Sequence, residues 1–382
     1  MQFAESTGLS SPGLSSAGKL PRRYLWTDAF AVCNFLDLYH QTRDEQYRRL
    51  AVSLVDQVHA MLGRHRADDT RTGWISRLDE QEGNLHPTIG GLRIGKKMKE
   101  RKSSEPFDEE MEWDRDGQYY HYLTKWMHAL NCVSRVTMDA TFNRWAMELA
   151  KTAHARFTYT PLRGRNKRMY WKMSIDLSSP LVPSMGQHDP LDGLITYSQL
   201  QAAADNNGEK SAWPDLSAEI AEMAGMCEGQ SWATDDPLGI GELLCNSFKV
   251  AQLIVSGDFE RPVLLEIMLD AVLPGLETYA SRKGLSLRAD YRLAFRELGL
   301  SLGLHAAERL QALILRHPDL FKKNGPLPAL IKNLMHYMPM AETIETFWLD
   351  SENRESGTWT SHQDINMVML ATSLAPDAYL LL

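Results

Sequence analysis

A stretch of the chain recurs after 95 positions. The six matched pairs are Thr42 and Thr137, Asp44 and Asp139, Tyr47 and Phe142, Ala51 and Ala146, Leu54 and Leu149, and His59 and His154. The matches span a turn and a helix whose apolar residues return every three or four positions. Internal repetition of this kind is the mark of folds that stack one supersecondary unit several times. We therefore expect an architecture built from αα-hairpins.

Helical patterns come in pairs along the rest of the chain. The first pair joins a helix that begins near Trp26 to a helix that ends at Gly63, and the second pair follows Tyr122. Later patterns cover residues 190–205 and 213–227, 238–255 and 260–279, 291–302 and 305–336, and 339–350 and 362–375. We find no convincing alternating strand run and no glycine-rich nucleotide loop. We expect an all-α fold of roughly twelve helices in six hairpins, with residues 1–20 as a disordered or loosely attached lead-in and residues 21–382 as a single domain.

Composition excludes several classes of protein. Hydrophobic residues make up 43% of the 382 residues and charged residues 24%, which are ordinary globular values. The net charge of −8 argues against broad electrostatic binding to nucleic acid or to an anionic membrane. No run approaches the roughly 18 apolar residues of a membrane span, and the N-terminus lacks signal-peptide features. We expect a soluble, cytoplasmic protein, and the oligomeric state stays open.

Cysteine and histidine spacing predicts no metal site. The four cysteines are far apart and form no CxxC pair; they are Cys33, Cys132, Cys227 and Cys245. Reduced structural thiols are the expected state. The candidate pocket histidines share no HxH or HExxH spacing; they are His86, His121, His188 and His362. We expect no metal and no cofactor.

The densest polar and aromatic cluster covers residues 113–122, directly before a helical run. Its candidates are Asp116, Gln118, Tyr120 and His121. Sugar hydroxyls need carboxylate and amide partners, and a general acid needs a pKa that an apolar pocket raises. A helix N-terminus also favours anions. The structural alternative is that Asp116 caps the helix and the tyrosines are core.

Acidic residues lie near the start of each helix that opens a hairpin. The candidates among them and their neighbours are Trp26, Asp28, Gln187, His188, Asp189, Asp192, His362 and Asp364. Aspartate is also a favoured helix N-cap, so every one of these acids has a structural alternative. We interpret Asp235, Asp236 and Asp290, which have few aromatic neighbours, as caps.

Two long segments interrupt the hairpins. The first long loop covers residues 64–117 and the second long loop covers residues 158–189. Loops of this length are usually functional or disordered. The first contains the candidates Trp74 and His86, which favour an ordered lid, and a basic stretch whose role stays open. The second contains Trp171 and Lys172, which could stack a sugar and hold an anion.

The hairpin series, with aromatic rings and carboxylates at alternate helix starts, resembles the six-hairpin (α/α)6 toroid glycosidases. Relatives in this superfamily include unsaturated glucuronyl hydrolases and N-acylglucosamine 2-epimerases. The segment from Trp26 to Asp28 is similar to the aromatic-x-Asp that opens inner helices in the hydrolases. His121 and His188 echo part of the epimerase pattern, and no complete family motif is matched. The resemblance covers residues 22–382 and implies parallel inner helices with a substrate cleft at one end.

Three functions follow from these patterns. The first is a glycoside hydrolase for a short oligosaccharide or a uronic-acid-containing sugar, with Asp116 as general acid or base and Asp28 or Asp189 as its partner. The second is a sugar epimerase in which His121 and His188 exchange protons. The third is a helical toroid that binds a ligand without catalysis. In each case we expect a small carbohydrate as the ligand.

Overall fold

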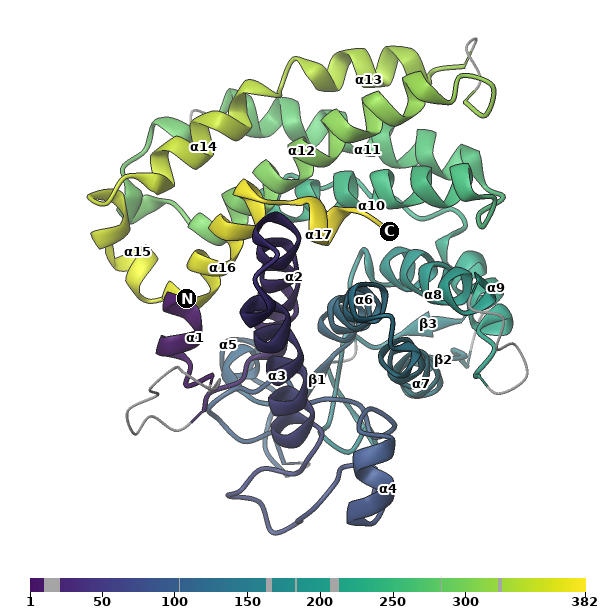
Figure 1. Ribbon diagram of the computed structural model, residues 1–382, viewed down its shortest axis with the longest axis vertical. Coiled ribbons are helices and arrows are strands. Elements are labelled where there is room, and N and C mark those ends of the chain that lie inside the picture. The colour runs from purple at the N-terminus through teal and green to yellow at the C-terminus, as the bar shows by residue number, and fades with distance from the viewer. Residues whose placement is uncertain are drawn as a thin grey trace. The chain divides into compact units, whose positions relative to one another are not determined.

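The structure is a computed structural model. It describes residues 1–9, 21–102, 104–162, 167–182, 184–206, 213–282, 284–321 and 325–382. Helices make up most of the described chain, as Figure 1 shows, so the predicted all-α class is confirmed. The chain divides into two compact units, Met1–Gln230 and Ser231–Leu382. Each is described by itself, and the expectation of a single domain over residues 21–382 stays a prediction.

The first unit contains three αα-hairpins and short additional helices. Its helices are α1 (Gln2–Ser6), α2 (Leu25–Thr42), α3 (Glu45–Leu62), α4 (Glu80–Leu85), α5 (Glu109–Asp114), α6 (Tyr120–Thr137), α7 (Ala140–Phe157), α8 (Asp189–Asn206) and α9 (Ser217–Cys227). The hairpins are α2 with α3, α6 with α7, and α8 with α9.

The second unit continues the hairpin series. Its elements are α10 (Pro237–Ser256), α11 (Pro262–Ser281), η1 (Gly284–Ser286), η2 (Ala289–Tyr291), α12 (Ala294–Arg316), α13 (Leu327–Met335), α14 (Pro339–Leu349), η3 (Asn353–Glu355), α15 (Gly357–Thr360), α16 (Gln363–Leu374) and α17 (Asp377–Leu380). Within it, α10 packs on α11, α12 on α13, and α14 on α16. In the described residues, the pairing of helices into six hairpins is confirmed.

The repeat found in the sequence extends over a whole hairpin. Each bound of α6 and α7 lies 95 positions after the matching bound of α2 and α3. Both turns use a left-handed residue, Arg43 with φ 59° and Met138 with φ 57°. The next residue then caps the second helix. Asp44 accepts from the N–H of Gln46 in the first copy, and Asp139 accepts from the N–H of Thr141 in the second.

The helices α2, α6 and α8 run parallel in the first unit. In each pair of helices, a contact that lies further along one helix also lies further along the other. These contacts are Tyr24 with Tyr122 and then Cys33 with His128 for α2 and α6, and Lys125 with Asp192 and then His128 with Gln199 for α6 and α8. The three helix starts therefore gather at one end of the unit.

Short strands bring the second long loop to the start of α6. They are β1 (Gln118–Tyr119), β2 (Thr158–Tyr159), β3 (Arg168–Met169), β4 (Lys172–Met173) and β5 (Pro180–Val182). The antiparallel order β1-β4-β5 forms one sheet, and β2 pairs with β3. Because β1 ends where α6 begins, this sheet holds Trp171, which precedes β4, beside that helix start.

Close packing and apolar composition mark α10 and α12. A Cβ atom on Gly241 would lie 2.0 Å from the carbonyl oxygen of Gly299, so only glycine allows this approach. Helix α10 is long and apolar enough to span a membrane, with a mean hydropathy of 1.3, although the sequence led us to expect no such run. Since 67% of that window is buried, α10 also has the features of a core helix.

The beginning of the chain differs in part from the expected loose lead-in. Helix α1 has Phe3 and Ala4 buried. The Nη2 group of Arg23 donates to the carbonyl oxygen of Thr7 at 2.7 Å, which ties the first residues to the start of α2. Residues 10–20 of the predicted lead-in lie outside the described residues.

Candidate functional site

Aromatic rings gather at the starts of α2 and α6. We define the aromatic cluster as Tyr24, Trp26, Trp113, Tyr119, His121, Tyr122 and Trp171. Tyr119 stacks on Trp171 with ring centroids 5.0 Å apart, and Trp113 meets Trp171 at 4.7 Å. His121 lies edge-on to Tyr122 at 4.6 Å. The cluster unites the predicted residues Trp26, His121 and Trp171.

Part of the aromatic cluster is open to solvent. Trp113 is 49% exposed, and His121, Tyr122 and Trp171 are half-buried. The hydroxyl group of Tyr119 is buried, and within the described residues it has no hydrogen-bond partner. Buried polar groups are normally satisfied, so an orphaned hydroxyl between aromatic faces is a candidate contact for a ligand. The combination of flat faces and an unmatched hydroxyl suits a polyhydroxylated molecule.

A tyrosine pair and a lysine adjoin the cluster. The hydroxyl oxygens of Tyr24 and Tyr122 are 2.6 Å apart, and the Lys96 ammonium lies 5.4 Å from the Tyr24 ring centroid. Burial raises the pKa of Tyr122 to about 12 and that of Tyr24 well above its ordinary value, so both phenols are neutral at pH 7. Burial lowers the pKa of Lys96. A polarised hydroxyl pair beside a cation can bind and polarise a ligand oxygen.

Asp116 is the centre of a buried ion-pair network. Its side chain is fully buried and accepts from Arg93 at 2.6 Å and from Arg66 at 3.1 Å. The backbone N–H groups of Gly95 and Lys96 donate to its other oxygen at 3.0 and 3.3 Å. These four donors fill the acceptor capacity of a carboxylate. Asp116 therefore ties the first long loop to the start of α6, and this environment does not support the predicted role of general acid.

Asp28 also binds groups of its own chain. Its buried carboxylate accepts from Arg23 at 3.2 Å and from the N–H of Tyr24 at 2.9 Å. Tyr24 is the N-cap residue of α2, so this contact satisfies an orphan donor of the helix start. Asp28 is not the N-cap that the sequence offered as its structural alternative, but it has a structural role in the first turn of α2.

The start of α8 holds the other predicted acids. Asp189 and Asp192 are both buried in the first turn, and Asp192 lies 3.4 Å from the ammonium of Lys125 on α6. His188 directly precedes α8 and is half-buried, while Gln187 is exposed. Since α6 and α8 run parallel, His188 lies at the same end of the unit as the first turn of α6.

Gln118 and Tyr120 serve the scaffold. The Gln118 amide is buried; it accepts from the N–H of Leu92 at 2.8 Å and donates to the carbonyl oxygen of Ile175 at 2.6 Å. It therefore joins the two long loops. The Tyr120 hydroxyl donates to the hydroxyl of Tyr197 on α8 at 2.8 Å inside the core. Neither residue is placed to bind substrate.

Three predicted loop residues are likewise engaged within the protein. The buried ammonium of Lys172 lies 2.9 Å from a carboxylate oxygen of Glu112 and donates to that residue's carbonyl oxygen at 2.6 Å. Trp74 is buried. The Nδ1 atom of His86 lies 2.8 Å from a carboxylate oxygen of Glu148 on α7. The predicted anion-binding role of Lys172 therefore has no support.

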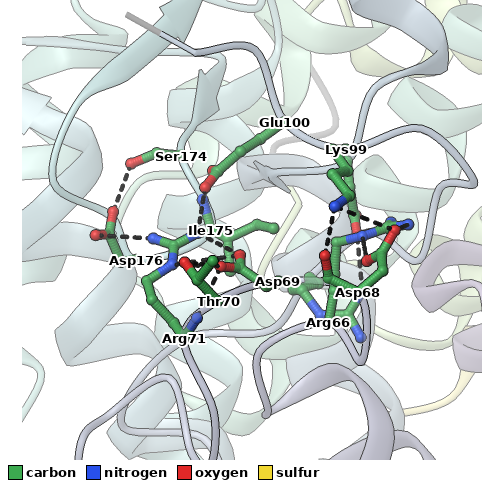
Figure 2. Close-up of polar contacts among 12 residues, drawn as sticks. Arg66, Asp68, Asp69, Thr70, Arg71, Lys99, Glu100, Ser174, Ile175 and Asp176 are labelled. Atoms are coloured by element: carbon green, nitrogen blue, oxygen red, sulfur yellow. Dashed lines mark hydrogen bonds and ion pairs between the residues drawn. The ribbon is translucent and has the colours of Figure 1, made fainter.

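Ion pairs order the first long loop, as Figure 2 shows. Arg71 contacts Asp69 at 2.8 Å within this loop and Asp176 of the second long loop at 3.2 Å. Arg71 also binds Glu100, whose other oxygen accepts from the N–H of Ile175 at 2.6 Å. In its described residues the first long loop is ordered, as expected, and it is fastened to the second.

The last predicted candidates belong to the second unit. His362 is exposed and precedes α16, and Asp364 lies in the first turn of that helix. The His362 ring packs against Phe295 at 5.6 Å. Among the predicted caps, Asp236 accepts from the N–H of Gly239 and caps α10, which confirms the interpretation for this residue. The interpretation is wrong for Asp290, which lies inside η2, where Arg288 is the N-cap.

Sequence reasoning omitted Tyr24, Tyr119 and Lys96 from the predicted site. Tyr24 stands two positions before Trp26, and Tyr119 lies inside the predicted cluster, so both were within reach of the pattern. Lys96 lies in the basic stretch of the first long loop, whose role the sequence left open. Only the fold shows that its ammonium points at an aromatic ring.

No known family model matches the sequence, and a search of curated proteins finds no match. The solved structures that are similar to this chain include three sugar epimerases. A sugar epimerase from a ruminal bacterium has a TM-score of 0.48 and 9% identity, over 92% of this chain and 87% of that one. Cellobiose 2-epimerases from Spirochaeta thermophila DSM 6192 and Bacillus thermoamylovorans B4167 give TM-scores of 0.49 and 0.47. Their identities are 14% and 12%, over 94% and 92% of this chain and 87% and 88% of those chains. These values are too low to establish a family or an activity, so the hairpin fold rests on the chain's own helices.

Proposed function

We propose that this protein is a carbohydrate-active enzyme that moves a proton at a sugar carbon, as an epimerase or isomerase does. The observation that carries the proposal is the position of His121. Its ring is half-buried, stacks on Tyr119 with centroids 6.0 Å apart and meets Tyr122 edge-on at 4.6 Å. Asp28 and Asp116 are buried, and each carboxylate is paired with an arginine. Histidine chemistry therefore has better support here than carboxylate chemistry.

The aromatic cluster supplies the contacts that a sugar needs. The C–H faces of a pyranose pack on flat rings, and Trp113 and Trp171 offer partly exposed ones. The hydroxyl group of Tyr119 and the hydroxyl pair of Tyr24 and Tyr122 can then exchange hydrogen bonds with sugar hydroxyls. We infer that a reducing mono- or disaccharide is the substrate class.

The proposed reaction is proton exchange next to a carbonyl group. In the open-chain form of an aldose, a base removes the proton at C2, and the electron pair of the broken C–H bond moves onto the carbonyl oxygen. Return of a proton to the opposite face of C2 inverts that centre. Neutral imidazole is suited to removing the proton and protonated imidazolium to returning one, and histidine can carry either form near pH 7. We assign the first transfer to His121 and the second to His188, and Lys96 would stabilise the enediolate oxygen.

The test is product analysis in D2O with a panel of reducing mono- and disaccharides. The proposal predicts the C2 epimer or the ketose, with deuterium at the exchanging carbon, and no new reducing ends. Release of reducing ends from glycosides without deuterium incorporation would favour the glycoside hydrolase instead. Saturable sugar binding with neither product would favour a protein that binds a carbohydrate without catalysis.

A further inference from the structure

A second cluster of chemically reactive side chains lies deeper along the parallel helices of the first unit. It consists of Cys33 on α2 and of His128 and Cys132 on α6, each about 1% exposed. Their sulfur and ring nitrogen atoms all lie within 4.8 Å of one another. We propose that these three side chains form a binding site for a soft, thiophilic metal ion, and that the ion is monovalent copper.

The repeat explains why these residues meet. Cys33 and His128 are 95 positions apart and so occupy the same place in the two copies of the hairpin. Because α2 and α6 run parallel, equivalent positions reach the same depth in the unit. Cys132 follows His128 by four residues and therefore lies on the same face of α6.

The separation of the Cys132 sulfur and the His128 nitrogen suits a metal ion. With a metal–sulfur bond of about 2.3 Å and a metal–nitrogen bond of about 2.0 Å, sulfur and nitrogen ligands are separated by about 3.5–3.8 Å in tetrahedral or trigonal geometry. The Sγ atom of Cys132 lies 3.6 Å from Nε2 of His128. Thiolate and imidazole are the ligands that Cu⁺ and Zn²⁺ prefer.

A chain of amides fixes the tautomer of His128. The carbonyl oxygen of Leu200 accepts from Asn143 at 3.2 Å, so the Oδ1 atom of Asn143 faces Asn131 and accepts from it at 2.9 Å. Asn131 in turn accepts from the amide nitrogen of Gln199 at 2.7 Å. The Oε1 atom of Gln199 then accepts from Nδ1 of His128 at 3.0 Å. Nε2, which faces Cys132, therefore offers its lone pair, as the outer shell of a metal site requires.

The charge balance favours a monovalent ion. Two thiolates with Cu⁺ leave one negative charge, and the Arg135 guanidinium lies 3.4 Å from Sγ of Cys132. Together they are neutral, whereas Zn²⁺ with the same groups would leave one positive charge. Structural Zn²⁺ sites also take four ligands, and this cluster supplies three. Arg135 stays protonated and acts as a counter-charge, not as a ligand. This site was not expected from the sequence, which predicted structural thiols only.

The experiment is an anaerobic titration of the reduced full-length protein with Cu⁺ against a chromogenic Cu⁺ chelator. We expect one ion per chain in the unmodified protein and in Cys245→Ser, which removes a buried thiol of α10. Cys33→Ser and Cys132→Ser should lose the ion. Gln199→Ala, which removes the partner of the histidine, should weaken binding by about 10–100-fold.

Three results would overturn the proposal. The first is an unmodified protein that retains no Cu⁺ against the chelator, and the second is unchanged stoichiometry in both cysteine variants. The third is tight binding of Zn²⁺ in a parallel titration without retention of Cu⁺. X-ray absorption at the copper edge of the unmodified complex needs no variant and must show sulfur and nitrogen neighbours. An oxygen-only shell would equally refute the site.

Discussion

Replacement of Asp116 by asparagine separates a structural role from a catalytic one. The carboxylate is fully buried and pairs with Arg93 at 2.6 Å and Arg66 at 3.1 Å. The substitution leaves Arg93, which is itself buried, without its anion and turns an amide N–H₂ group toward other donors. Loss of one partner of a buried ion pair costs about 3–5 kcal/mol. We therefore expect the free energy of unfolding of Asp116→Asn to fall by about 3–5 kcal/mol.

The assay is urea denaturation followed by circular dichroism, with Asp114→Asn as the matched control. Asp114 is exposed and lies two positions away, so its substitution should change the free energy of unfolding by no more than about 0.5 kcal/mol. If Asp116→Asn kept the stability of the unmodified protein but lost its activity on sugars, the structural assignment would be wrong. That result would support Asp116 as a general acid.

Three further predictions concern stability. Burial lowers the pKa of His59 to about 3, and the unfolded state takes up this proton below about pH 6.5, so stability is lost as the pH falls between these values. Between pH 7 and pH 4.5 the free energy of unfolding from urea titrations should fall by up to about 2.7 kcal/mol more in the unmodified protein than in His59→Gln. An equal fall in the two proteins would contradict this prediction. Gly241→Ala should lower the free energy of unfolding by about 1–3 kcal/mol because its Cβ would overlap Gly299. Its control is Gly225→Ala in α9, where a Cβ meets nothing within 4 Å, and this variant should raise the free energy of unfolding by up to about 1 kcal/mol. Met138→Gly should raise the free energy of unfolding by about 1 kcal/mol, since the exposed side chain sits at φ 57°, and a loss of stability would show that its strain is relieved elsewhere.

Periodicity predicted the helices well where the pattern was local. The repeat reproduces the second helix of each early hairpin because apolar spacing, an aspartate cap and a left-handed turn residue lie within a few positions of one another. The pattern failed in α12, which was expected to end near residue 302 and continues to Arg316. Gly299 and Gly303 interrupt the apolar pattern, yet both remain helical because α10 packs against them. The strands were missed because two or three residues carry no detectable period.

The site was less predictable because its contacts are distant in the sequence. Asp116 was chosen for its aromatic neighbours, and nothing local shows that Arg66, fifty positions earlier, donates to it. Trp26, His121 and Trp171 did converge in the aromatic cluster, since each stands next to a helix start or to the strand that pairs there. Cys33 and Cys132 carry no short motif, so only the parallel packing of α2 and α6 brings them together.

The most direct test of the proposed activity is the rate of deuterium incorporation at the exchanging sugar carbon, measured by NMR for the unmodified protein, His121→Asn and His40→Asn. His40 is an exposed histidine near the end of α2, away from the helix starts, and serves as the control. The account predicts incorporation by the unmodified protein and by His40→Asn, and a loss of about 10²–10⁴-fold in His121→Asn. Undiminished incorporation by a folded His121→Asn variant would contradict the central claim.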